Sequence, residues 1–240
     1  MQFEVIVENE EALKKCKKFV TGFHGLGEVG FITVRHLVEE LKCERVAIIS
    51  SSAAPPFVSI EKGRLKLPFE LYVHQDIAIF IPHLQHYRHV QIEFSEHLSN
   101  WIIQQGFEVG YFIGGVDVRL QTGDENVRYI PTREYIAQKK ELDAPFLEDE
   151  LFVAGPLAVM LGLLDLNQFP AIGILTYADR SHPDTSSAAK AVTKLAQILD
   201  IKVEVSSLLE DKQEIEEKLL QKLAAAQEEE KSDQPAQLYT

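Results

Sequence analysis

The sequence predicts an α/β fold with a mixed, mostly parallel β-sheet that is covered by helices on both faces. Apolar runs of strand length recur along the chain without polar alternation, which is typical of strands buried on both faces. Helical periodicity appears between these runs and favours strand–helix–strand units. The turn Thr122-Gly123-Asp124, flanked by apolar segments, predicts a hairpin and therefore an antiparallel pair in the same sheet.

The first half of the chain alternates strands and helices in a regular order. A short strand is expected at 19–21, before a glycine-rich turn, and a helix is expected at about 29–41, where apolar residues recur every three or four positions. Gly and Pro end the later apolar runs. The other elements expected in this half are a strand at 45–49, a loop at 50–56, strands at 69–73 and 77–81, a helix at 90–105, and a strand at 109–113 that ends at Gly114-Gly115.

The second half continues the same alternation. The Gly155-Pro156 pair separates an apolar run from a helical one, because Pro is favoured in the first turn of a helix. The elements expected here are hairpin strands at 116–120 and 126–130, strands at 151–154 and 171–176, helices at 156–164 and 186–199, and a short strand at 201–205.

The C-terminal end differs from the body in its pattern. Ser207 and Glu210 have the spacing of a capping box, and apolar residues then recur four apart, which predicts a helix at 207–226. The periodicity stops after this point, and residues 227–240 are rich in Glu, Ser and Asp, as is typical of a flexible tail. We therefore expect a single α/β domain at 1–226, including this helix, and a flexible acidic tail that ends in Leu238-Tyr239-Thr240.

Charge and cysteine content narrow the class of function. The chain has 24 Lys and Arg against 37 Asp and Glu, a net charge of −13, which opposes binding to nucleic acid or to an anionic membrane. Cys16 and Cys43 form no paired motif, so the sequence indicates neither a disulfide framework nor a zinc site and fits a reducing, cytoplasmic setting. The N-terminus lacks a signal-peptide pattern, and no apolar run is long enough to span a bilayer.

The turn from Gly25 to Gly30 matches G-x-G-x-x-G between a predicted strand and a predicted helix. This pattern can hold a phosphate on backbone N–H groups at a helix N-terminus. Glu28, however, places a negative charge in the turn, and the next strand ends in Ser50-Ser51-Ser52 rather than in an acid that would bind a ribose. A tight, closely packed turn is the favoured interpretation. Gly114-Gly115, which also follows a strand, either lines a small-molecule crevice or forms a turn into the hairpin.

Several histidines and a His-Pro-Asp motif are candidates for metal binding or catalysis. His83, His86 and His89 are spaced by three, and His89, Glu93 and His97 by four, a possible metal stripe that is more typical of a solvated helix face. In His182-Pro183-Asp184-Thr185-Ser186, the residues Asp184 or Thr185 are expected to cap a helix rather than to form a catalytic triad. No catalytic, metal-binding or cofactor-binding residue is therefore predicted.

The final three residues, Leu238, Tyr239 and Thr240, are the predicted partner-binding residues. A tethered tail that ends in an apolar residue, a Tyr and a free carboxylate has the chemistry needed for capture by a partner protein. The carboxylate can pair with a Lys, while the Tyr ring supplies buried area and a hydroxyl group.

The chain resembles the proteasome assembly chaperone family, and in particular the archaeal homologues of the second eukaryotic proteasome assembly chaperone. The resemblance rests on the strand and glycine turn at 19–30, where His24 stands at a position usually held by Pro, and on Tyr111-Phe112-Ile113-Gly114-Gly115. It continues through 151–164 and 173–199. The chain end is similar to the hydrophobic–Tyr–any-residue tail of proteasome activators and assembly factors.

This resemblance implies a three-layer αβα fold similar to nucleoside phosphorylases, a homo-oligomer, and no established reaction or cofactor. We take a tetramer as the working number of subunits. It also implies that Leu238, Tyr239 and Thr240 insert between neighbouring α-subunits of the proteasome core particle, where the carboxylate meets a lysine. The function expected is that of an ATP-independent proteasome activator, an assembly chaperone, or both.

Two other classes of function stay open on the sequence alone. One is an enzyme of phosphorylase-like fold that binds a nucleoside or phosphate at its glycine turns. The other is an adaptor whose acidic helix, 207–226, binds a different partner through residues such as Glu214, Glu216 and Glu217.

Overall fold

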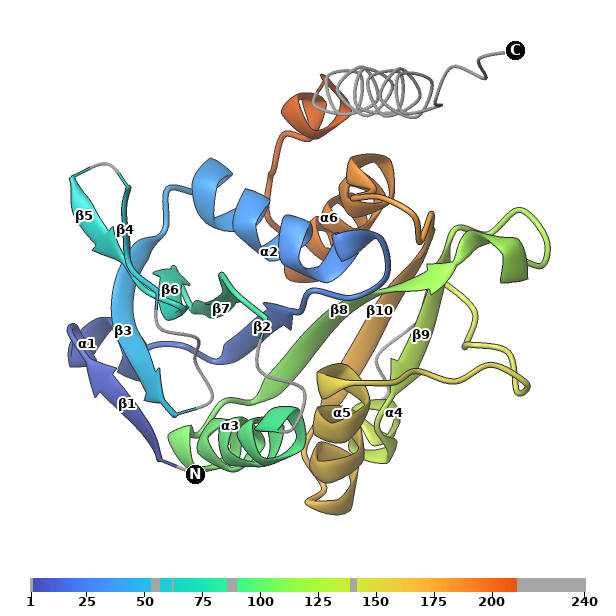
Figure 1. Cartoon of the computed structure of the whole chain (residues 1–240). Coiled ribbons are helices and arrows are strands. Elements are labelled where there is room, and N and C mark those ends of the chain that lie inside the picture. Colours follow the sequence, from blue (N-terminus) through green and yellow to red (C-terminus); the bar gives the residue numbers. More distant parts are fainter. Residues whose placement is uncertain (1, 53–56, 62, 86–89, 139–141, 211–240) are drawn as a thin grey trace, which may run out of the picture.

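The computed structural model describes residues 2–52, 57–61, 63–85, 90–138 and 142–210, and the fold is built from ten strands and six α-helices within these ranges (Figure 1). The strands are β1 (Phe3–Val7), β2 (Lys18–Gly22), β3 (Glu44–Ser51), β4 (Ser59–Glu61), β5 (Arg64–Lys66), β6 (Phe69–His74), β7 (Ile77–Pro82), β8 (Val109–Asp117), β9 (Val127–Pro131) and β10 (Ala171–Ala178). The helices are α1 (Glu10–Lys14), α2 (Val29–Glu40), α3 (Gln91–Gln105), α4 (Arg133–Ala137), α5 (Pro156–Leu166) and α6 (Thr185–Leu199).

Eight strands form one mixed sheet in the order β1-β3-β6-β7-β2-β8-β10-β9, and β4 and β5 form a separate hairpin. The pairs β7–β2, β2–β8 and β8–β10 are parallel, and the other four pairs in the sheet among the described strands are antiparallel. The predicted mixed α/β sheet is confirmed. Its parallel character is confined to the four adjacent strands β7, β2, β8 and β10, and antiparallel pairs extend the sheet on both sides of them.

Helices cover both faces of the sheet and make the fold three-layered (Figure 1). Strand β7 shows why its sequence is uniformly apolar. Ile77, Ile79 and Ile81 belong to a core cluster shared with α2 and α6, while Ala78 and Phe80 belong to a cluster shared with α3 and α5. Because successive side chains in a strand point to opposite faces, both sets are buried only when helices pack on both sides.

The predicted hairpin between 116–120 and 126–130 is wrong. Strand β9 pairs with β10, with Ile174 opposite Tyr129, and β10 lies between β8 and β9. The turn signal at 122–124 is local, whereas the neighbour of β8 is chosen by burial: every residue of β10 is buried, so it occupies an interior position of the sheet. The segment around 122–124 thus connects two strands that do not pair.

Several element boundaries also differ from prediction. Strand β8 does not end at Gly114-Gly115 but continues to Asp117, because β10 pairs alongside it as far as Ala178. Residues 151–154 and 201–205 form no strand. Strand β3 extends to Ser51, inside the predicted loop. The edge strand β1 and the short helix α1 were not predicted.

The C-terminal helix is described only in its first turn. Residues 206–210 are helical, and the rest of the predicted 207–226 helix lies outside the described residues, as does the predicted tail at 227–240. In the part of the chain that the structure describes, no helix is both long enough and apolar enough to cross a bilayer.

Candidate functional site

The predicted contact residues Leu238, Tyr239 and Thr240 lie outside the described residues. The chain leading toward them leaves the fold beside α2. There, Nε2 of His36 lies 2.6 Å from the backbone oxygen of Glu204, and Leu208 is buried against the core cluster of α2 and α6. These contacts anchor residues 204–208 to the fold, so the C-terminal segment starts from a defined place on its surface.

The glycine turn between β2 and α2 is a packing device. A Cβ atom at Gly27, whose φ is +59°, would lie 2.9 Å from the Ala178 Cβ and from the Asp179 backbone oxygen. The negatively charged Glu28 occupies the N-cap position of α2. The interpretation as a tight, closely packed turn is therefore confirmed, and the charge of Glu28 disfavours a phosphate at this helix terminus.

A crevice of about 570 Å³ lies at the carboxyl ends of the parallel strands β2 and β8, the edge where open α/β sheets usually bind ligands. Gly114 and Gly115 line it, as one of the two sequence-based interpretations expected. Most of its lining is apolar, and Phe152 in this lining is 87% exposed. Asp117 and Glu150 supply acidic groups, and the described lining includes no Lys or Arg. This crevice is suited to apolar or cationic groups rather than to phosphate.

Two polar groups of the crevice are already engaged within the fold. Hydrogen bonds from Arg119 lower the pKa of Asp117 to about 2, so this carboxylate is ionised and held by the arginine. His24 packs its ring on Phe31, with ring centroids 4.0 Å apart, and its Nε2 lies 3.0 Å from the Pro82 backbone oxygen. Burial lowers the pKa of His24 despite the opposing charge of Glu28.

The other candidate histidines and the His-Pro-Asp motif contact neighbouring residues of the fold where they are described. His83 contacts Glu70, and His97 packs its ring near Phe3, while His86 and His89 lie outside the described residues. Among the residues that the structure describes, no group of three or more His, Cys, Asp or Glu is arranged to hold a metal ion. Asp184 caps α6, as predicted, and accepts a hydrogen bond of 2.9 Å from the Ser187 N–H.

Replacing Asp184 with alanine is expected to lower the free energy of unfolding by about 1–2 kcal/mol, the usual range for a lost N-cap. The Asp184 carboxylate also accepts from the Asp179 N–H and the Ser187 hydroxyl, which places the expected value at the upper end. Urea denaturation measures it, and Asp184→Asn, which keeps one cap acceptor, should recover part of the loss. Equal stability of Asp184→Ala and the wild type would contradict this account.

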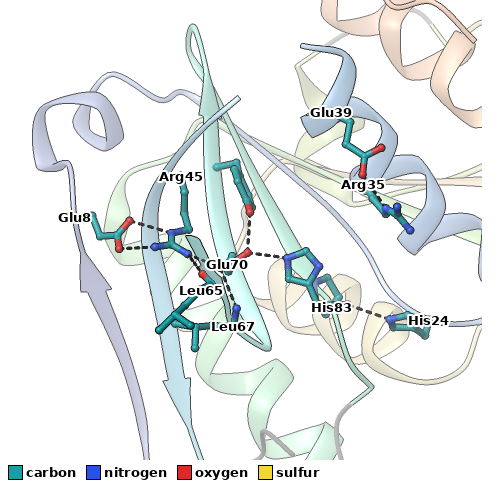
Figure 2. A network of polar contacts seen from close by, with 11 residues as sticks. Glu8, His24, Arg35, Glu39, Arg45, Leu65, Leu67, Glu70 and His83 are labelled. Atoms are coloured by element: carbon teal, nitrogen blue, oxygen red, sulfur yellow. Dashed lines mark hydrogen bonds and ion pairs between the residues drawn. The ribbon is translucent and has the colours of Figure 1, made fainter. Parts of the chain in front are cut away.

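A second cavity, of about 320 Å³, lies between α2, the β4–β5 hairpin and one end of the sheet, and we call it the Glu70 cavity (Figure 2). Its wall contains Glu70, a carboxylate only 1% exposed at its side chain, which lies between the apolar residues Phe69 and Leu71 of β6. Arg45 Nη1 donates to it at 2.6 Å, the Leu67 N–H at 3.1 Å, the Tyr72 hydroxyl at 2.7 Å, and His83 Nε2 lies 2.8 Å away.

The four donors determine the charge state of Glu70. Burial alone raises the pKa of this carboxyl, but the hydrogen bonds from His83, Tyr72, Leu67 and Arg45 outweigh it and lower the pKa to about 2. The carboxylate is therefore ionised at neutral pH, and it orients Arg45, Tyr72 and His83 around one point. A side chain that is charged, buried and fully bonded forms a rigid polar wall for the cavity.

Sequence reasoning missed the Glu70 cavity because its residues come from distant segments. The one available signal was the acid inside the apolar run 69–73, which departs from the uniform pattern of a buried strand. Its partners Arg45 and His83 are 25 and 13 residues away, and their proximity depends on the antiparallel β3–β6–β7 pairing.

The fold and its sites define a three-layer α/β protein with an apolar strand-end crevice and a separate polar cavity. Residues 19–224 match the PAC2 family, and the chain belongs to this family. In sequence it is similar to the uncharacterized protein MJ1210 of Methanocaldococcus jannaschii, with 26% identity over 196 residues that cover 79% of this chain and 76% of that protein.

Solved structures of Pyrococcus furiosus proteins show the same fold. PbaA, described as an archaeal homolog of proteasome-assembly chaperone, is 22% identical with a TM-score of 0.77, and the match covers 91% of this chain and 95% of PbaA. PbaB, described as an archaeal proteasome activator, is 21% identical with a TM-score of 0.74, and the match covers 93% of this chain and 99% of PbaB.

Proposed function

We propose that this chain is a cytoplasmic, non-enzymatic proteasome activator or assembly chaperone that binds the α-ring of the core particle through Leu238, Tyr239 and Thr240. The observation that carries the proposal is the likeness over nearly the whole chain to both PbaA and PbaB. Membership of the PAC2 family and the hydrophobic–Tyr–any-residue chain end support it.

The described fold fits a tail-based mode of binding. The C-terminal segment is anchored beside α2 at 204–208, and after the expected helix the eleven residues 227–237 span at most roughly 36–40 Å when fully extended. We further propose a homo-oligomer, with a tetramer as the working number. Several tails on one body bind a ring of α-subunits with gains of about 10²–10⁴ over a single tail.

Removal of the last three residues tests this proposal. The 1–237 chain is expected to lose binding to an archaeal core particle and to lose any ATP-independent stimulation of peptide hydrolysis, because both the terminal carboxylate and the Tyr ring are gone. Peptide hydrolysis and co-sedimentation are measured side by side. Gln234→Ala, with the tail end intact, is the matched control and should behave as the wild type.

The outcomes separate the alternatives. Stimulation by the full-length chain alone indicates an activator, whereas tail-dependent co-sedimentation without stimulation indicates an assembly chaperone. Unchanged binding of the 1–237 chain contradicts the tail mechanism. If binding is then lost on charge reversal of Glu214, Glu216 and Glu217, the acidic segment is the contact instead. The strand-end crevice, whose described lining has two acidic residues and no Lys or Arg, gives no support to the alternative of a phosphate-binding enzyme at the glycine turn.

A further inference from the structure

The Glu70 cavity has the composition of a binding site for a small anion that carries an apolar ring. Its volume of about 320 Å³ lies within the range of small-molecule sites. Five basic and three acidic residues line it, a local excess of positive charge in a chain whose net charge is −13. Apolar surface is present as well, from Val38, Tyr72 and Ile81.

Arg45 is part of the frame rather than of the ligand-binding surface. Its guanidinium donates to both carboxylate oxygens of Glu8, to the Leu65 backbone oxygen and to Glu70, so four of its five N–H groups are used. Glu70 in turn is surrounded by four donors. Neither group needs a ligand to satisfy it, and together they hold the wall of the cavity in one geometry.

The remaining cations come from different elements and surround the opening. Lys42 follows α2, Arg64 and Lys66 lie on β5, and Arg35 on α2 is held by Glu39 at 2.9 Å. Within the described residues, Lys42 and Arg64 have no ion-pair partner. Two exposed cationic groups from separate elements in one lining are suited to an anion with several oxygens, because such an anion accepts charge-assisted hydrogen bonds from both.

His83, in the same wall, has one ring nitrogen that makes no hydrogen bond within the described residues. Its Nε2 faces Glu70, and its side chain is 6% exposed, while its Nδ1 has no hydrogen-bond partner in the described part of the chain. Figure 2 shows the His83 ring beside Glu70, with Arg35 and Glu39 on the neighbouring helix α2. A buried ring nitrogen left unbonded is uncommon in a purely structural network.

We propose that the Glu70 cavity binds a small phosphomonoester carried on a flat ring. The phosphate contacts Lys42 and Arg64 at the opening, and the ring packs against Val38, Tyr72 and Ile81. Inorganic phosphate would make no contact with the apolar side chains, and a neutral ring compound would make no ion pair with Lys42 and Arg64. A phosphomonoester on a ring contacts both groups. This inference is independent of the C-terminal tail and of proteasome binding.

Calorimetric titration of the full chain with adenosine 5′-monophosphate tests the proposal, with adenosine and inorganic phosphate as separate titrants. The monophosphate is expected to bind at least about tenfold more tightly than either fragment, because each fragment retains only one set of contacts. Shifts of the Tyr72 and His83 side-chain signals in NMR spectra locate the ligand. The absence of monophosphate binding, or equally tight binding of phosphate alone, overturns the proposal.

Variants of the cavity residues provide a second test, in which the affinity for the monophosphate is measured. The double change Lys42→Gln and Arg64→Gln is expected to weaken binding about tenfold or more, since charge-assisted hydrogen bonds are lost while both residues are exposed and outside the core. Lys190→Gln with Arg180→Gln removes the same charge elsewhere and should leave affinity within about twofold. Val38→Trp fills the cavity and should abolish binding without changing the charge. Unchanged affinity in the Lys42/Arg64 variant contradicts the assigned contacts.

Discussion

Replacing Glu70 with alanine is expected to lower the free energy of unfolding by about 3–5 kcal/mol, the range for removing one partner of a buried ion pair. The side chain is 1% exposed and accepts from four groups. Without it, the Tyr72 hydroxyl and the Leu67 N–H lose their acceptor, and Arg45 keeps only Glu8 and the Leu65 oxygen. Chemical denaturation measures the change.

Matched variants separate the charge of Glu70 from its shape. Glu70→Gln keeps the volume but places an amide N–H₂ among four donors, so it should still cost about 2–3 kcal/mol. Glu8→Gln removes the more exposed partner of Arg45 and should cost at most about 1 kcal/mol. If the Glu70→Ala and Glu8→Gln chains are equally stable, the buried network does not carry the stability assigned to it.

Because Glu70 is ionised in the folded state, we expect the free energy of unfolding to fall at acidic pH. The folded-state pKa of Glu70, about 2, lies below the ordinary value of 4.5, so the ionised form is the one that folding stabilises. The contribution, roughly 3 kcal/mol from the shift, is complete above pH 4.5 and is lost as the pH falls toward 2. Denaturation curves recorded across this window should show a smaller loss for Glu70→Gln than for the wild type.

The second large effect is expected at Gly30, where the first turn of α2 lies against the sheet. A Cβ atom there would lie 2.5 Å from the Ile113 backbone oxygen and 2.8 Å from the Phe23 backbone nitrogen. Backbone atoms cannot rotate away as side chains do, so the whole helix must move off the sheet. Gly30→Ala is expected to cost about 3 kcal/mol or more, at or above the upper end of the usual overpacking range.

Gly162 on α5 provides the control for Gly30. A Cβ atom at Gly162, which lies in a helix, meets no heavy atom within 4 Å apart from its chain neighbours and the backbone of its own helix. Gly162→Ala is therefore expected to raise stability by up to about 1 kcal/mol through helix propensity. Thermal and urea unfolding of both variants give the comparison. A Gly30→Ala chain as stable as the wild type would show that α2 is not pressed onto the sheet.

Strand and helix content could be predicted from the sequence wherever the signal was local. The apolar run of β7, the periodic helix α2 and the Asp184 cap each depend on residues within one or two turns of one another. The glycine turn was also interpretable, because an acid at its centre and the absence of a ribose-binding acid favoured packing over phosphate.

Strand order could not be predicted in the same way. The turn at 122–124 indicated a β8–β9 hairpin, yet β10 occupies that place, some forty residues later in the sequence. Pairing is decided by which strand can bury both faces and all of its backbone groups, and β10 is buried along its whole length. A local turn signal contains no information about that competition.

The sequence by itself determined the class of fold and the packing role of the glycine turn, since each depends on residue types close together in the chain. Only the tertiary structure decided that Glu70, Arg45, Tyr72 and His83 meet around one cavity. Their meeting requires the register of three antiparallel strands. In that setting a buried charge is stable because donors from separate segments surround it, and such long-range complementarity leaves almost no trace in the linear pattern.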